Sequence, residues 1–168
     1  MDYKAGCELD ATPLSFTDAN GEYRDEMLLS GRTMVISVYD PAKLKPSEWV
    51  RVSQALSDAC AAGIEPMVLC AGDPTSLESF VPAPELLMNM YFADRKQLMT
   101  LNRSNGGGVL VNDAQILGKW SLHSLPDTET LSGTVDETQT ETISRFSSGQ
   151  RLRFQAFLLY VFAVMLLL

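Results

Sequence analysis

The chain has 168 residues, of which 46% are apolar and 20% charged, so it can form one domain of ordinary size with an appendage and is too apolar to be wholly disordered. Its 21 acidic residues against 13 basic ones give a formal net charge of −8, and we therefore expect no nucleic-acid partner. The three scattered cysteines, Cys7, Cys60 and Cys70, and the single histidine, His123, exclude a disulfide framework, a zinc knuckle and any site built from two imidazoles. A lone loop histidine of this kind is expected to lie in solvent.

Short apolar runs alternate with amphipathic stretches between residues 14 and 126, which is typical of an α/β sandwich. Leu14–Thr17 is predicted to form a first strand. Met34–Tyr39 is almost continuously apolar and β-branched, which predicts a central strand with helices on both faces. A helix is predicted to begin at Pro46 and to stop at Gly63. Its apolar side chains recur at Trp49, Val52, Leu56 and Cys60.

The middle of the chain predicts two further strands and a helix. Met67–Ala71 reads as a buried strand, parallel to the central one because a whole helix lies between them. Residues 75–90 contain two interrupting prolines and give no clear pattern until Asn89–Phe92, a predicted short strand. Asp94 is predicted to cap a helix that ends near Asn102.

A β-hairpin is predicted after the three glycines Gly106–Gly108. Its strands are Val109–Val111 and Gln115–Trp120, and its turn is placed at Asn112 and Asp113, because these residue types tolerate positive φ. The glycines could also form a phosphate-binding loop, but they lead into a strand and lack the lysine-containing ending of such loops. A hairpin lead-in or a peptide-contacting loop is therefore favoured.

Two segments of different composition follow residue 126. Residues 127–150 hold six threonines and carry five acidic groups against one basic group, which predicts a flexible polar tether. Residues 151–168 end in 13 consecutive apolar residues, a helix of about 20 Å, whereas a bilayer core needs about 20 residues. We expect a transmembrane helix that is cut short and reaches the lipid bilayer through residues 154–168. A buried C-terminal helix is the alternative. The predicted organisation is a domain over 1–126, a linker over 127–150 and a helix over 151–168.

The order strand, helix, strand, helix and antiparallel hairpin resembles the thioredoxin-like fold over most of residues 10–126. The stretch Leu101–Gly107, followed by Gly118-Lys119-Trp120 and Leu125-Pro126, is similar to the thioredoxin-like domain of bacterial DoxX-type membrane proteins. The resemblance implies a three-layer sandwich with a mixed central sheet, a membrane-protein partner and a periplasmic location. The arginines before the apolar run favour the cytoplasmic side instead, so both orientations stay open.

The resemblance also shows which catalytic parts are missing. Thioredoxin-like enzymes carry a nucleophilic thiol just after the strand that corresponds to Met34–Tyr39, and a cis-proline just before the hairpin. Here the first segment, Asp40–Pro46, contains no sulfur, and Gly106 stands at the proline position. The sequence therefore predicts a redox-inactive interaction module and not an enzyme. The alternative is a thiol oxidoreductase or peroxidase that uses Cys70 alone, although the apolar strand around Cys70 favours core packing.

A candidate binding edge is formed by the loops at one end of the predicted sheet. Asp40, Asp73 and Asp94 each follow a predicted strand and could together hold Mg²⁺ or Ca²⁺. Each also precedes a turn or helix, where aspartate is a favoured cap, so we expect no metal and no cofactor. The residues of the predicted edge are Asp40, Lys43, Cys70, Asp73, Ser104, Asn105 and Gly106.

Overall fold

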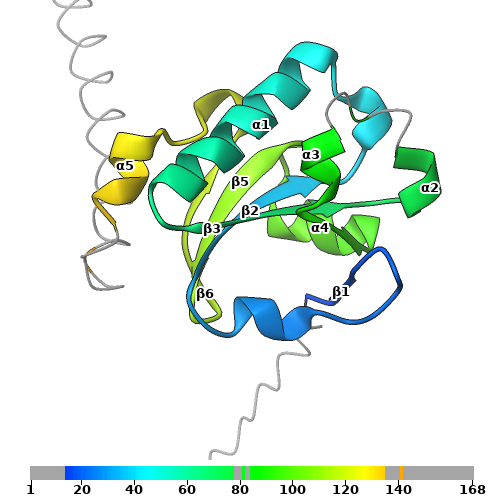
Figure 1. The fold of residues 1–168 in the computed structure, drawn as a ribbon, viewed down its shortest axis with the longest axis horizontal. Coiled ribbons are helices and arrows are strands. Elements are labelled where there is room, and N and C mark those ends of the chain that lie inside the picture. The colour runs from blue at the N-terminus through cyan, green and yellow to red at the C-terminus, as the bar shows by residue number, and fades with distance from the viewer. Residues whose placement is uncertain (1–13, 78–80, 82–83, 135–140, 142–168) are drawn as a thin grey trace, which may run out of the picture.

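A computed structural model describes residues 14–77, 81, 84–134 and 141 of the protein. Its core is one six-stranded mixed sheet in the order β1-β4-β3-β2-β5-β6, with α1 on one face and α4 on the other (Figure 1). The predicted α/β architecture is confirmed. The strands are β1 (Phe16–Thr17), β2 (Arg32–Val38), β3 (Glu65–Cys70), β4 (Met90–Ala93), β5 (Gly107–Asn112) and β6 (Gln115–Trp120). The helices are α1 (Pro46–Ala61), α2 (Pro74–Leu77), α3 (Pro84–Leu87), α4 (Arg95–Leu101) and α5 (Thr128–Ser132), with 3-10 turns η1 (Asp25–Leu28), η2 (Pro41–Lys43) and η3 (Leu122–Ser124).

Strand β2 lies near the centre of the sheet, as its apolar sequence predicts. It runs parallel to β3 and antiparallel to β5. Met34 and Ile36 belong to the cluster beneath α1, whereas Val35 belongs to the cluster on the α4 face. Both faces of the strand are therefore covered, which explains why its run of apolar residues is unbroken.

The predicted packing of Cys60 against the sheet is wrong, because this side chain is exposed. Helix α1 does begin at Pro46, and Gly63 follows it with a φ of +73°, as expected of a helix stop. Successive helical residues turn by about 100°, so the buried stripe is centred on Val52 and Ala59 and leaves Cys60 at its border. The buried residues of α1 are Trp49, Val52, Ala55, Leu56 and Ala59.

The hairpin turn lies one residue later than predicted. Asp113 and Ala114 form it, with φ values of +46° and +63°, while Asn112 is still part of β5. The Ala114 N–H donates to the Leu28 carbonyl at 2.8 Å, so contact with η1 fixes the position of the turn. The turn preferences of Asn and Asp carry no information about this tertiary contact, so they placed the turn one residue too early.

The packed body also extends past the predicted start of the tether. Helix α5 lies beside α1 (Figure 1), and the Thr128 hydroxyl donates to Asp58 Oδ1 at 2.7 Å. Leu131 and Thr134 are fully buried, so residues 127–134 are not a free linker as expected. Apart from Glu141, the rest of the predicted linker and the predicted helix 151–168 lie outside the described residues. Within the described ranges, no helix combines the length and apolar character needed to span a bilayer.

Candidate functional site

The loop after β2 carries an ion-paired carboxylate where the resemblance places a catalytic thiol. Asp40 Oδ2 lies 3.0 Å from Lys43 Nζ and 3.3 Å from a terminal guanidinium nitrogen of Arg95. The Asp40 side chain is 18% exposed, much less than its two cationic partners. Asp40 precedes η2 but makes no side-chain capping bond, so ion pairing and not capping accounts for its position.

Asn105 joins the loop before β5 to this carboxylate-bearing loop. Its Oδ1 accepts the Asp40 N–H at 3.0 Å, and its Nδ2 donates to the Asp40 carbonyl at 2.7 Å. A side-chain amide has the same donor and acceptor as a peptide group, so Asn105 satisfies both backbone groups of Asp40 at once. The two loops are therefore held as one unit.

Gly106, the residue at the expected proline position, is required by local geometry. Its φ is +76°, and its N–H donates to the Ser37 carbonyl at 2.8 Å. A Cβ atom placed on Gly106 would lie 3.1 Å from Leu122 Cδ1. A glycine suits this backbone conformation and this close approach, and its amide is already used within the protein.

A pocket of about 240 Å³ opens between these loops and the start of α1. Ser104 helps to shape it, because its Oγ accepts the Leu122 N–H at 3.1 Å and so holds η3 against the loop before β5. A second pocket, of about 170 Å³, shares Leu122 and His123 with the first. The residues that line the larger pocket are Tyr39, Lys43, Leu44, Glu48, Ser104, Asn105, Leu122 and His123.

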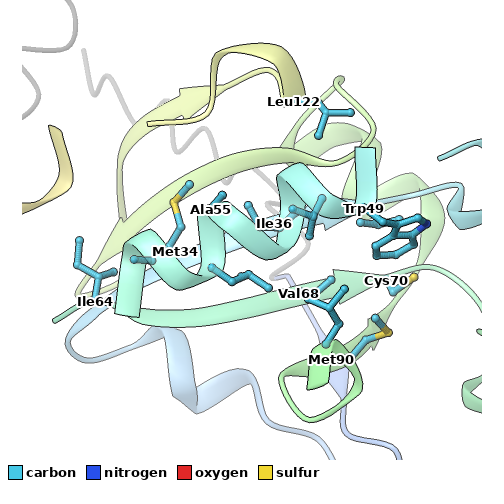
Figure 2. Packing of buried hydrophobic residues seen from close by; sticks show 14 of the residues in the cluster. Met34, Ile36, Trp49, Ala55, Ile64, Val68, Cys70, Met90 and Leu122 are labelled. Carbon is cyan, nitrogen blue, oxygen red and sulfur yellow. The ribbon is translucent and has the colours of Figure 1, made fainter. Parts of the chain in front are cut away.

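Cys70 lies at the end of β3 but its thiol does not reach the pocket. The residue is fully buried among the apolar side chains beneath α1, in the layer that Figure 2 shows with Trp49 and Val68. Burial raises the pKa of the Cys70 thiol from its ordinary value of 9.0 to about 12. The thiol is therefore protonated at neutral pH, which is the opposite of what a nucleophilic cysteine needs.

Asp40, Asp73 and Asp94, the three candidate cation ligands, have different surroundings in the structure. Asp94 caps α4, where its side chain accepts the N–H groups of Lys96 and Gln97. Asp73 is exposed in the loop that follows β3, just before α2. In the part of the chain that the structure describes, no group of three or more His, Cys, Asp or Glu side chains is arranged to hold a metal ion.

The structure thus brings together five of the seven predicted edge residues and separates two. Cys70 is buried in the core, and Asp73 belongs to the neighbouring loop. Sequence reasoning did not identify Arg95, whose guanidinium reaches Asp40 from α4. It also placed His123 simply in solvent, whereas this exposed side chain lines both pockets. The residues brought together are Asp40, Lys43, Ser104, Asn105 and Gly106.

Known proteins resemble the chain in fold and not in sequence. No protein-family model and no curated protein matches it. Yeast Sco1 is similar at 14% identity and a TM-score of 0.50, over 73% of this chain and 89% of that chain. A thioredoxin-like protein from Aeropyrum pernix shows 16% identity and a TM-score of 0.47, over 73% and 89% of the two chains. StoA from Bacillus subtilis shows 16% identity and a TM-score of 0.45, over 72% and 96%.

Identity this low bears on the fold alone. The match to yeast Sco1 covers 73% of this chain, whose own sheet has β3 parallel to β2 on one side and β5 antiparallel on the other. The chain therefore has a thioredoxin-like fold.

Proposed function

We propose that this protein is a binding module that keeps the thioredoxin-like fold but performs no dithiol exchange at the usual edge. The observation that carries the proposal is the Asp40–Pro46 segment: it has no sulfur, and its first residue is a carboxylate paired with Lys43 and Arg95. A carboxylate can neither form a disulfide nor exchange one. The burial and raised pKa of Cys70 give no support to the alternative of a single-cysteine enzyme.

The binding surface in this proposal is the edge around the larger pocket. The hydrogen bonds of Asn105 to Asp40 and of Leu122 to Ser104 hold its loops in place, and prearranged loops lose less conformational entropy when a partner binds. Exposed His123 lines this pocket together with Leu44 and Leu122, whose side chains are mostly buried. A rigid rim of this mixed character suits contact with another protein.

We also propose that the module works at a membrane, as part of a DoxX-type protein or beside a membrane-domain partner. The apolar run after residue 155 and the resemblance of Leu101–Gly107 to DoxX-type domains support this proposal. The resemblance favours the periplasmic side for the domain.

Disulfide reduction by the full chain in mild detergent tests the redox part of the proposal. Insulin reduction by dithiothreitol is followed with the wild type and with a variant in which Cys7, Cys60 and Cys70 are all serine. We expect both to match the rate without protein. An enzyme-like rate that Cys70→Ser alone abolishes would refute the proposal and establish the single-cysteine alternative.

Site-specific photocrosslinking in native membranes tests the binding part. A photoreactive residue at position 123 is compared with one at position 65, which is exposed at the other end of β3. We expect a discrete crosslinked protein from position 123 and none from position 65. Equal crosslinking from both positions, or none from either, would contradict a binding role for this edge.

A further inference from the structure

Three basic residues lie around the Tyr39–Asp40 segment in a chain whose formal net charge is −8. Lys43 and Arg95 both reach the Asp40 carboxylate, and the Arg103 carbonyl accepts the Tyr39 hydroxyl at 3.2 Å. We call Lys43, Arg95 and Arg103 the basic cluster. Its members come from the loop after β2, from α4 and from the loop before β5, so the fold joins cations that are far apart in the sequence.

The cluster has more donors than its internal carboxylate can use. The side chain of Lys43 is 74% exposed and that of Arg95 is 57% exposed, while Asp40 is only 18% exposed. An ammonium group has three N–H donors and a guanidinium has five, so one carboxylate leaves most of them directed elsewhere. Arg103 is exposed, and its backbone carbonyl is hydrogen-bonded to Tyr39, the residue before Asp40. The surface therefore offers hydrogen-bond donors and positive charge to an incoming group.

Two neighbouring carboxylates keep their negative charge, but their oxygens are already hydrogen-bonded at the starts of helices. Asp94 accepts two amide N–H groups of α4, and Glu48 Oε2 accepts the Lys45 N–H at 2.8 Å. Asp73 follows β3, on the opposite side of β2 from the loop that carries Arg103.

We propose that the basic cluster binds an acidic segment of the partner protein, whose Asp or Glu carboxylates pair with Lys43, Arg95 and Arg103. This inference rests on the proposed function and names the chemistry of its partner. Arginine binds carboxylates with two parallel hydrogen bonds, which adds orientation to attraction. A short segment with a few carboxylates fits this local patch, whereas a long polyanion would also meet the net negative charge of the rest of the protein.

A binding titration tests the inference with the full chain in mild detergent. The probe is a fluorescein-labelled decapeptide of alternating Glu and Ser, followed by fluorescence anisotropy, and the matched peptide has Gln in place of Glu. We expect the Glu peptide to bind, the Gln peptide to bind at least about tenfold more weakly, and the affinity for the Glu peptide to fall as salt is added. Equal binding of the two peptides, or no binding of the Glu peptide at low salt, would overturn the inference.

Charge variants locate the site. Arg103→Glu should weaken binding of the Glu peptide about tenfold, the usual scale for replacing an attractive surface contact by a repulsive one. Arg51→Glu makes the same change in net charge at an exposed residue of α1 that lines the second pocket and lies outside the basic cluster, and it should change the affinity less than twofold. Asp40→Asn removes the internal carboxylate that competes for Lys43 and Arg95, so it should tighten binding severalfold. Equal weakening by Arg103→Glu and Arg51→Glu would show only a general charge effect and contradict the assignment.

The two proposals can fail separately. If position 123 still crosslinks to one protein while the Glu peptide does not bind, the acidic partner is wrong and the binding module stands. If Cys70-dependent insulin reduction is found, the binding module is wrong whatever the peptide does.

Discussion

The side-chain amide of Asn105 pairs with the backbone of Asp40 through two hydrogen bonds, 3.0 Å at the Asp40 N–H and 2.7 Å at its carbonyl. The last register pair between β2 and β5 joins Ser37 to Gly107. Asn105 continues the contact between these two chain segments past that pair, with a side chain in place of backbone. The loop that carries the ion-paired carboxylate is thereby fixed to the loop that carries Arg103.

Asn105→Ala should destabilise the protein by about 1–3 kcal/mol, because it leaves the Asp40 N–H and carbonyl without their partner in a half-buried position. Urea unfolding of the full chain in mild detergent measures the change. Asn20→Ala is the matched control, since Asn20 is exposed in a turn and should cost no more than about 0.5 kcal/mol. Equal losses for the two variants would mean that the Asn105 pair contributes nothing specific.

Gly106→Ala should cost more than Gly21→Ala. Both glycines have positive φ, +76° and +83°, so both substitutions impose backbone strain of about 1 kcal/mol. Only at Gly106 would the new Cβ also press on Leu122, at 3.1 Å, whereas nothing lies within 4 Å at Gly21. The difference between the urea midpoints of the two variants measures the cost of the contact with Leu122 separately from the cost of backbone strain. A larger loss for Gly21→Ala would contradict the close packing of η3 on the loop before β5.

The sequence alone was enough to predict the strands and helices whose signals lie within the element itself. The unbroken apolar run of β2 and the proline and glycine at the ends of α1 are signals that neighbouring residues carry by themselves. The Asp113-Ala114 turn was misplaced because a hydrogen bond to Leu28 decides it. Leu131 was assigned to a tether because one apolar residue in a polar stretch does not reveal the α1 surface that buries it.

The candidate site could be predicted only in part, for the same reason. The missing sulfur and Gly106 are visible in the sequence. The ion pair of Arg95 with Asp40 is not, because it depends on how α4 packs against the sheet. The burial of Cys70 was predicted from the apolar residues around it in the sequence. Burial among such residues raises the pKa of the thiol, because they offer no positive charge to stabilise a thiolate.

Leu131→Ala should destabilise the protein by about 2 kcal/mol or more, because it empties a fully buried position between α5 and the rest of the core. Hydrogen exchange of residues 127–134, together with urea unfolding, measures the effect. Glu129→Ala changes an exposed residue on the same helix and should leave both readings nearly unchanged. If Leu131→Ala were as mild as Glu129→Ala, the segment would be the free tether that its composition suggests.

Stability should fall with rising alkaline pH in a way that depends on Cys70. The pKa of its thiol is raised to about 12 in the folded protein, so the unfolded chain releases this proton near pH 9 while the folded chain keeps it. The contribution of the thiol is fully present below pH 9 and is lost as the pH rises toward 12. Between pH 8 and pH 10 the wild type should lose about 1 kcal/mol more than Cys70→Ala, by urea unfolding under reducing conditions. Cys60→Ala keeps Cys70 and should follow the wild type. Parallel pH dependence of the wild type and Cys70→Ala would contradict a buried, protonated thiol.

The central claim, that this thioredoxin-like edge has no working thiol, is tested most directly by the rate at which Cys70 is alkylated in the folded protein at neutral pH. Mass spectrometry after timed exposure to iodoacetamide separates the cysteines, and exposed Cys60 serves as the internal reference. We expect Cys60 to be labelled while Cys70 stays protected until denaturant is added. Rapid labelling of Cys70 in the folded protein would contradict the central claim.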